Sequence, residues 1–134
     1  MKAFDHLSPH VLAHETACKC GCGFGAREAD VDPILLDRFE ALRSLAGDHP
    51  LIINCGCRCQ KHNAAVGGAP NSQHTHGRAF DLAHGSPVWL ASLAEEAGFN
   101  GIITYDWGVH VDVRPLEVYH DDRRTHRHEH TATL

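Results

Sequence analysis

The longest helical pattern in the chain follows Asp32. Its apolar residues recur at every third or fourth position: Leu35, Phe39, Leu42 and Leu45. Asp32 is a favourable N-cap residue, and Pro33 suits the first helical position. Gly47 suits the end of a helix, because glycine tolerates the left-handed conformation found there. The pattern predicts a helix over residues 33–46.

The second half of the chain mixes short strand patterns with one more helix. Ser86, Pro87 and Gly98 delimit a second amphipathic helix. Four stretches fit β-strands: residues 51–54, 78–84, 101–107 and 109–115. The last two are joined near Trp107 and Gly108, so they predict an antiparallel hairpin. We expect an α+β fold in which helices pack on one face of a small, largely antiparallel sheet.

The chain divides into three parts by composition. Residues 1–31 are rich in Gly and Cys without a clear period, so we expect an irregular arm. Residues 32–115 carry the predicted helices and strands and form the main domain. Residues 116–134 are polar and rich in histidine, and we expect this tail to be disordered.

Charge and hydropathy narrow the classes of partner. The formal net charge is −5 with neutral histidines, which argues against a nucleic acid held by bulk charge. No segment approaches the roughly 20 apolar residues of a membrane helix. The first residues also lack the apolar run of a secretory signal. We expect a monomer that is synthesised in the cytoplasm.

Polar side chains interrupt two of the predicted strands. Asp81 lies between Phe80 and Leu82, where a buried carboxylate needs a partner. His110 lies between two valines, on the strand face that also carries Asp112 and Arg114. His74 precedes the strand that carries Asp81. Two histidines and one aspartate suit zinc with an open fourth position. Spacing alone leaves His76 and His84 as rival ligands.

These residues stand in a recognisable order. The segment "CRCQKHNAAVGGAPNSQHTHGRAFDL", followed by "GVHVDVR", resembles the zinc D-Ala-D-Ala carboxypeptidase family, and in particular its phage and prophage subset. That family belongs to a wider group with lysostaphin-type peptidases and the hedgehog signalling domain. Its pattern S-x-H-x-x-G-x-A-x-D is matched by Ser72, His74, Gly77, Ala79 and Asp81. Arg58 and Asn63 match the family's G-x-R-S/C-x-x-x-N segment.

The resemblance implies a site and an activity. It implies one catalytic Zn²⁺ on His74, Asp81 and His110. Arg58 would hold an oxyanion or a substrate carboxylate, and Ser72, Gln73 and His76 would border the substrate. The implied activity is hydrolysis of peptidoglycan stem peptides, either as a D-Ala-D-Ala carboxypeptidase or as an L-Ala-D-Glu endopeptidase. A wall hydrolase of the endolysin kind, released at lysis, would fit.

The general base is open at this point. Many relatives carry an acid three residues before the last histidine, and this chain has Trp107 there. Asp106 is one residue further back and would serve only if the hairpin bends. Asp112 shares a strand face with His110 and would serve as the base or orient the histidine.

Six cysteines form two C-x-C-x-C triplets: Cys18, Cys20 and Cys22, then Cys55, Cys57 and Cys59. They would form a second, structural zinc site, disulfides, or buried thiols. The tail "HRHEH" would at most bind metal loosely. Two other functions remain possible from the sequence. The first is a non-catalytic zinc module that binds wall peptides or a protein partner, because Trp107 replaces the usual acid. The second is a metal-storage or metal-sensing protein, because the chain is rich in Cys and His.

Overall fold

The computed structural model describes residues 5–125, and its two longest helices lie where the apolar spacing predicts them. Helix α2 spans Pro33–Leu45 and α4 spans Pro87–Ala97. The Asp32 side chain caps α2 by accepting a hydrogen bond from the Ile34 amide at 2.9 Å. Leu45 in the last turn is 41% exposed, while the buried stripe ends with Ala46.

The main sheet has five strands in the order β3-β4-β6-β5-β7. Its strands are β3 (Ile52–Cys55), β4 (Ala79–Ala83), β5 (Gly101–Tyr105), β6 (Gly108–Asp112) and β7 (Tyr119–Asp122). Strands β3 to β6 pair antiparallel, which confirms the α+β class and the predicted hairpin. The sheet as a whole is mixed, because β7 runs parallel to β5.

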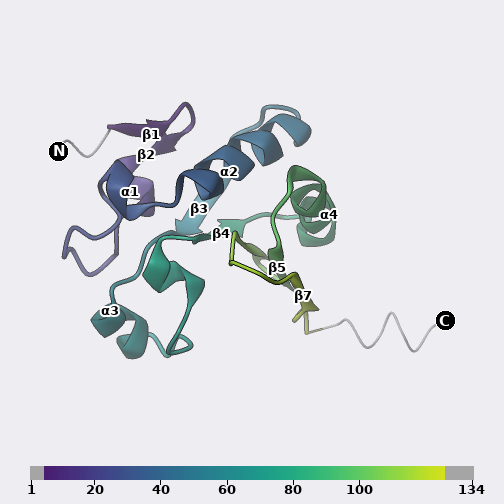
Figure 1. Ribbon diagram of the computed structural model, residues 1–134. Helices are drawn as coiled ribbons and strands as arrows, with labels where there is room; N and C mark the ends of the chain where they lie inside the picture. Colours follow the sequence, from purple (N-terminus) through teal and green to yellow (C-terminus); the bar gives the residue numbers. More distant parts are fainter. Residues whose placement is uncertain (1–4, 126–134) are drawn as a thin grey trace.

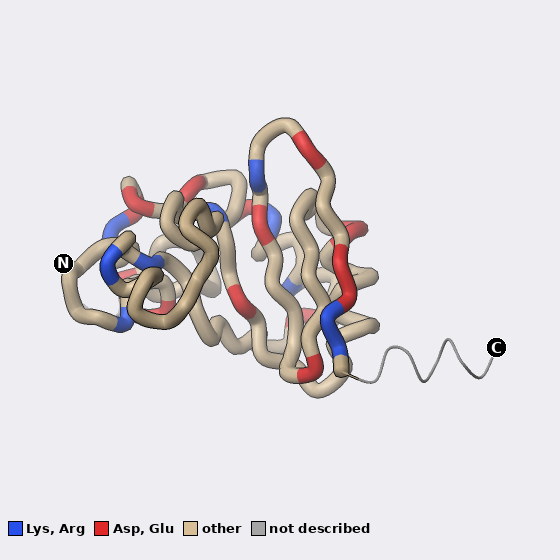
Figure 2. The backbone as a smooth tube through the Cα atoms, turned by 90° about the horizontal axis from the view of Figure 1, so that it is seen from below, with Lys and Arg blue, Asp and Glu red and all other residues tan. Residues whose placement is uncertain are grey.

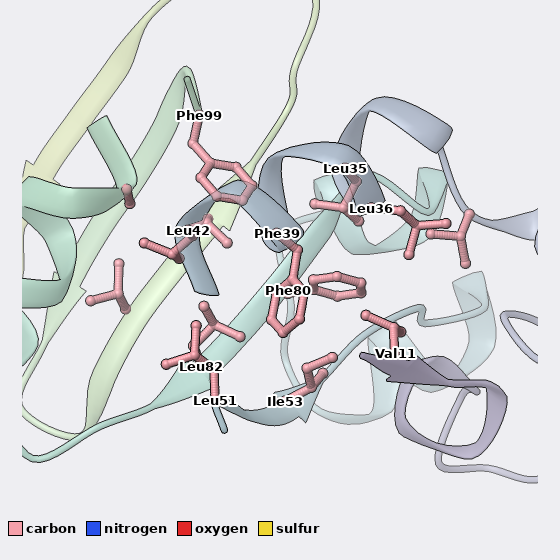
Figure 3. Packing of buried hydrophobic residues seen from close by; sticks show 14 of the residues in the cluster. Val11, Leu35, Leu36, Phe39, Leu42, Leu51, Ile53, Phe80, Leu82 and Phe99 are labelled. Carbon is pink, nitrogen blue, oxygen red and sulfur yellow. The ribbon is translucent and has the colours of Figure 1, made fainter. Parts of the chain in front are cut away.

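The two faces of this sheet differ in chemistry. Phe80 and Leu82 of β4 and Val109 and Val111 of β6 are fully buried and belong to the hydrophobic core. Phe39 of α2 packs edge-on against Phe80, with ring centroids 5.6 Å apart (Figure 3). Strand residues between these positions point to the opposite face. The helices therefore hold one face of the sheet and leave the other to polar side chains.

The N-terminal segment is more ordered than its composition predicts. It contains β1 (His6–Ser8), β2 (Val11–Leu12), α1 (Ala13–Thr16) and the 3₁₀ turn η1 (Glu28–Asp30). Leu7 and Val11 from the β1–β2 hairpin join the hydrophobic core, and Figure 1 shows this hairpin beside α2. The segment was expected to be an irregular arm, but it forms regular secondary structure where its apolar side chains are buried.

The C-terminal segment also differs from the expectation of disorder. Strand β7 lies inside the polar stretch after residue 115, where it adds backbone hydrogen bonds to the edge of β5. Its sequence, YHDD, has no apolar alternation, so a hydrophobic pattern does not reveal it. The "HRHEH" tail lies outside the described residues. No described helix is long and apolar enough to cross a membrane.

Two short helical segments frame the long Gly- and Pro-containing loop. Helix α3 spans Gln60–Ala65 and the 3₁₀ turn η2 spans Gln73–His76. Residues 66–69 and 71–72 of the loop between them line the same cleft as Asp81 of β4 and His110 of β6. It brings residues from the sequence motif over the strands that carry Asp81 and His110.

Candidate metal centre

The structure brings His74, Asp81 and His110 together from three different elements. Asp81 and His110 are direct partners in the β4–β6 pairing, and His74 comes from η2. The same carboxylate oxygen, Asp81 Oδ1, lies 3.1 Å from His74 Nε2 and 2.9 Å from His110 Nδ1. Three side chains of the types that bind zinc thus meet at Asp81 Oδ1.

The motif around His74 has a structural explanation. Ser72 Oγ accepts a hydrogen bond from the His74 amide at 3.2 Å and so caps η2. Gly77 then ends the turn with φ +66, a left-handed conformation that glycine adopts without strain. A Cβ atom on Gly77 would lie only 2.0 Å from the carbonyl oxygen of Asp30. The chain therefore needs glycine here to enter β4 with His74 beside Asp81.

Each histidine ring is held by its other nitrogen. His74 Nδ1 donates to the Gly56 carbonyl oxygen at 2.6 Å, and His110 Nε2 donates to Asp112 Oδ2 at 2.7 Å. His74 Nε2 and His110 Nδ1, the two nitrogens that face Asp81, hydrogen-bond its carboxylate, and each would offer a lone pair to a metal ion that takes the place of the proton. Metal-binding histidines are oriented in this way in proteins. The donor set therefore fits a zinc ion.

The electrostatics of the cluster favour a cation. Burial alone would raise the pKa of Asp81, but hydrogen bonds from His110 and His74 outweigh it and hold the pKa well below its usual range. Burial lowers the pKa of His74, but the hydrogen bond and charge of Asp81 raise it to about 9. Asp81 is thus an ionised, partly buried carboxylate, and metal binding at His74 competes with a proton.

Asp112 lies behind His110 rather than in front of it. It is fully buried, and its two oxygens accept hydrogen bonds from His110 and from the backbone and side chain of Arg114. Burial alone would raise its pKa, but these contacts with Arg114 and His110 hold the pKa well below its usual range. Its geometry suits a residue that positions His110.

Cys55 is a neighbour of the centre that the sequence reasoning did not place there. It pairs with Asp81 in the β3–β4 register, and its sulfur lies within 4.8 Å of donor atoms of both His74 and Asp81, so that these three residues form a group that could hold a metal ion. Its Sγ lies 3.9 Å from His74 Nδ1. That nitrogen already donates to Gly56, so the His74–Asp81–His110 set is the better zinc site.

The three side chains line a cleft of about 530 Å³. Arg58, Ser72 and Gln73 line its first wall, together with residues 66–69. The backbone amide of Arg58 donates to the His74 carbonyl at 3.0 Å, which ties this wall to the centre. Arg58 Nε and Gln73 Oε1 are buried without a hydrogen-bond partner among the described residues. Both residues belong to the cleft lining, and these two buried atoms have unused hydrogen-bonding capacity.

The opposite wall comes from β5, β7 and the segment between β6 and β7. It consists of Ile103, Tyr105, Arg114, Tyr119 and Arg123. Arg123 donates to the hydroxyl groups of Tyr105 and Tyr119, and Arg114 lies over the Tyr119 ring at 4.7 Å. Sequence reasoning missed this wall because β7 carries no apolar pattern.

Figure 2 shows Lys and Arg interspersed with Asp and Glu along the described chain.

Three other predicted side chains lie apart from the cleft lining. The β5–β6 register is continuous from Gly101 to Tyr105, so the hairpin lacks the bend that would bring Asp106 to the centre. The Asp106 carboxylate instead accepts hydrogen bonds from the amide and hydroxyl of Thr125. His76 bonds Asn71, and the His84 ring packs near Trp89.

The chain is similar in sequence to a known peptidase. The zinc D-Ala-D-Ala carboxypeptidase of Streptomyces albus G is 39% identical to this chain over 77 residues. The match covers 56% of the chain and 30% of the relative, so the chain spans less than a third of that protein.

The model of the peptidase M15 family matches residues 6–113. The matched region includes the N-terminal hairpin as well as His74, Asp81 and His110. The match covers most of the chain. The chain therefore belongs to the peptidase M15 family.

Proposed function

We propose that the chain is a zinc peptidase that hydrolyses peptide bonds in peptidoglycan stem peptides. The observation that carries this proposal is the shared position of Asp81 Oδ1 between His74 Nε2 and His110 Nδ1 on the floor of a cleft. Membership of the peptidase M15 family and the name of the Streptomyces relative support the reaction class.

The residues of the centre have two separate roles, which are to bind the ion and to orient the histidine rings. His74, Asp81 and His110 would hold the ion, and Gly56 and Asp112 keep the two rings in orientation. When bound, zinc supplies a Lewis acid that polarises a carbonyl group and lowers the pKa of a water molecule. An open fourth position distinguishes such a site from a closed structural one.

Arg58 is the cationic side chain of the cleft that suits the substrate. Arg114 and Arg123, the other two arginines of the lining, are paired with Asp112 and Asp121. The buried Nε of Arg58 has no such partner among the described residues. Because guanidinium offers paired donors to carboxylates and oxyanions, we assign Arg58 to the stem-peptide carboxylate or to the carbonyl under attack, with Ser72 and Gln73 beside it.

The second candidate function is a zinc module that binds wall peptides without cleaving them. One observation favours it: Asp81, itself a proposed ligand, is the single carboxylate among the described residues that line the cleft. The lining thus offers no second carboxylate as general base for hydrolysis. Hydrolysis would need a base from the substrate, from solvent or from a movement of the cleft walls.

Incubation with purified muropeptides separates the two functions and gives the bond that is cleaved. Zinc-loaded protein should produce fragments that mass spectrometry assigns either to loss of the terminal D-Ala or to cleavage between L-Ala and D-Glu. The His110→Ala variant should leave the same muropeptides intact. Retention of zinc and binding of muropeptides without any fragment would favour the binding module and overturn the peptidase proposal.

A further inference from the structure

Four cysteines from two distant segments gather at the surface of the protein. Their sulfur atoms all lie within 4.8 Å of one another: Cys18, Cys20, Cys22 and Cys59. The first three come from the loop after α1, and Cys59 is the N-cap residue of α3. Figure 1 places this loop and α3 on the same side of the molecule. All four are free cysteines.

The spacing of the sulfur atoms matches a metal tetrahedron. The Sγ–Sγ distances are 3.5 Å for Cys18–Cys20, 3.7 Å for Cys20–Cys59 and 3.9 Å for Cys18–Cys59. Four thiolates at about 2.3 Å from a zinc ion stand about 3.8 Å apart along the edges of the tetrahedron. A disulfide would require a separation of about 2.0 Å. We propose that these four cysteines hold a second zinc ion, separate from the centre at His74.

The backbone around the cluster is arranged for thiolates. The Cys59 amide points to Cys18 Sγ and the His62 amide to Cys59 Sγ, each at 3.4 Å. The loop closes with hydrogen bonds from the Gly21 amide to the Cys18 carbonyl and from the Cys18 amide to the Phe24 carbonyl. Gly21 and Gly23 have φ values of +84 and +92, which let alternate cysteines turn toward one point.

The other two cysteines show that the cluster is selective. Cys57 is 2% exposed, belongs to the hydrophobic core, and has its Sγ 3.9 Å from the Asp30 carbonyl. Cys55 faces His74 instead. The two sequence triplets are therefore not equivalent: the first contributes all three of its thiols, and the second contributes Cys59 alone.

The consequence of such a site is structural. Four protein ligands leave no open position for water or substrate. The ion would join the loop after α1 to the start of α3, next to Arg58 and ahead of the loop that lines the catalytic cleft. It would thus fix the first wall of the cleft to the N-terminal segment.

Metal content tests the proposal without reference to activity. Tag-free protein, purified under reducing conditions and dialysed against zinc-buffered solution, is analysed for zinc and iron. The Cys20→Ser/Cys59→Ser double variant should hold one zinc ion per chain fewer than the wild type, and the control variant Cys57→Ala should hold as many. Equal zinc content in the wild type and the double variant, or iron in place of zinc, would overturn the proposal.

A second measurement uses the wild-type protein, so that its result does not depend on the folding of the double variant. Cobalt-substituted wild type should show the strong thiolate-to-cobalt charge-transfer absorption, and a mercurial thiol reagent should release one equivalent of zinc from the native protein. Absence of the absorption, or a protein mass lowered by disulfide formation with no zinc released, would contradict a thiolate site.

Discussion

At the scale of single residues, the candidate centre depends on which ring nitrogen of each histidine faces Asp81. His74 and His110 each use one ring nitrogen to hold a fixed oxygen acceptor and present the other to Asp81. The role of Asp112 follows from this arrangement. Its contacts make it a positioning residue for His110, whereas Asp106 contacts Thr125 at the far end of the hairpin.

Asp112→Asn should weaken zinc binding by about 10- to 100-fold, as expected when the hydrogen-bond partner of a histidine ligand is changed. Activity per bound zinc should change much less. Competition with a chromogenic chelator measures the affinity, and hydrolysis at saturating zinc measures the activity. A variant with full zinc affinity but no activity would instead make Asp112 the general base.

Asp106→Asn is expected to retain zinc and activity close to those of the wild type. The physical reason is distance: Gly108 lies two strand residues from His110, which is about 7 Å of strand rise, and Asp106 lies beyond it in the turn. Steady-state hydrolysis of a stem peptide checks the expectation. A zinc-loaded but inactive Asp106→Asn protein would show that the hairpin rearranges when substrate binds.

Arg58→Ala should lower kcat/KM by about 10²- to 10³-fold, the range found for removal of a donor that stabilises developing charge. Bound zinc should stay at the wild-type level, because no atom of Arg58 belongs to the donor set. Arg58→Lys keeps the charge but loses the paired donors, so it should recover only part of the activity. Loss of zinc together with activity would mean that Arg58 is structural.

At the scale of elements, short strands depend on contacts that a sequence pattern does not contain. Helices α2 and α4 and the strands β3 to β6 follow their apolar periods, whereas the direct pairing of Asp81 with His110 is a matter of strand register that the pattern does not give. Strand β7 has the polar sequence YHDD and exists through pairing with β5. The second wall of the cleft, with Tyr105, Tyr119 and Arg123, was unpredictable for the same reason.

The N-terminal hairpin shows how such an element is held. Glu40 on α2 accepts hydrogen bonds from the Ser8 hydroxyl, the His10 amide and the His10 ring, at 2.6, 2.8 and 2.6 Å. Burial alone would raise the pKa of Glu40, but the contacts with Ser8 and His10 lower it below its ordinary value. The ionised carboxylate therefore anchors the β1–β2 hairpin to α2.

Glu40→Ala should lower the free energy of unfolding by about 1–2 kcal/mol near neutral pH, because it removes three hydrogen bonds to the carboxylate. The loss is limited to this range because solvent screens the partly exposed contacts. Because the folded-state pKa is lowered, the contribution of Glu40 is present above the ordinary glutamate pKa and is lost as the pH falls through the folded-state value. The difference from wild type should shrink accordingly in acid. Asp37→Asn, also on α2, is the control and should have little effect.

At the scale of the whole molecule, the hydrophobic core and the candidate site lie on opposite faces of the main sheet. One face of the sheet is covered by α2 and α4, and the other carries the metal donors under the loop between α3 and η2. The chain spans less than a third of its Streptomyces relative. Strand β7 adds a further edge to the sheet by pairing with β5.

The central claim is that His74, Asp81 and His110 together hold the catalytic zinc. Diffraction from crystals of the zinc-loaded protein, recorded on both sides of the zinc absorption edge, locates the ion directly. We expect an anomalous peak about 2.0–2.2 Å from His74 Nε2, an Asp81 oxygen and His110 Nδ1. A peak bound instead by Cys55 and His74 Nδ1, or no peak within reach of these three side chains, would contradict the account.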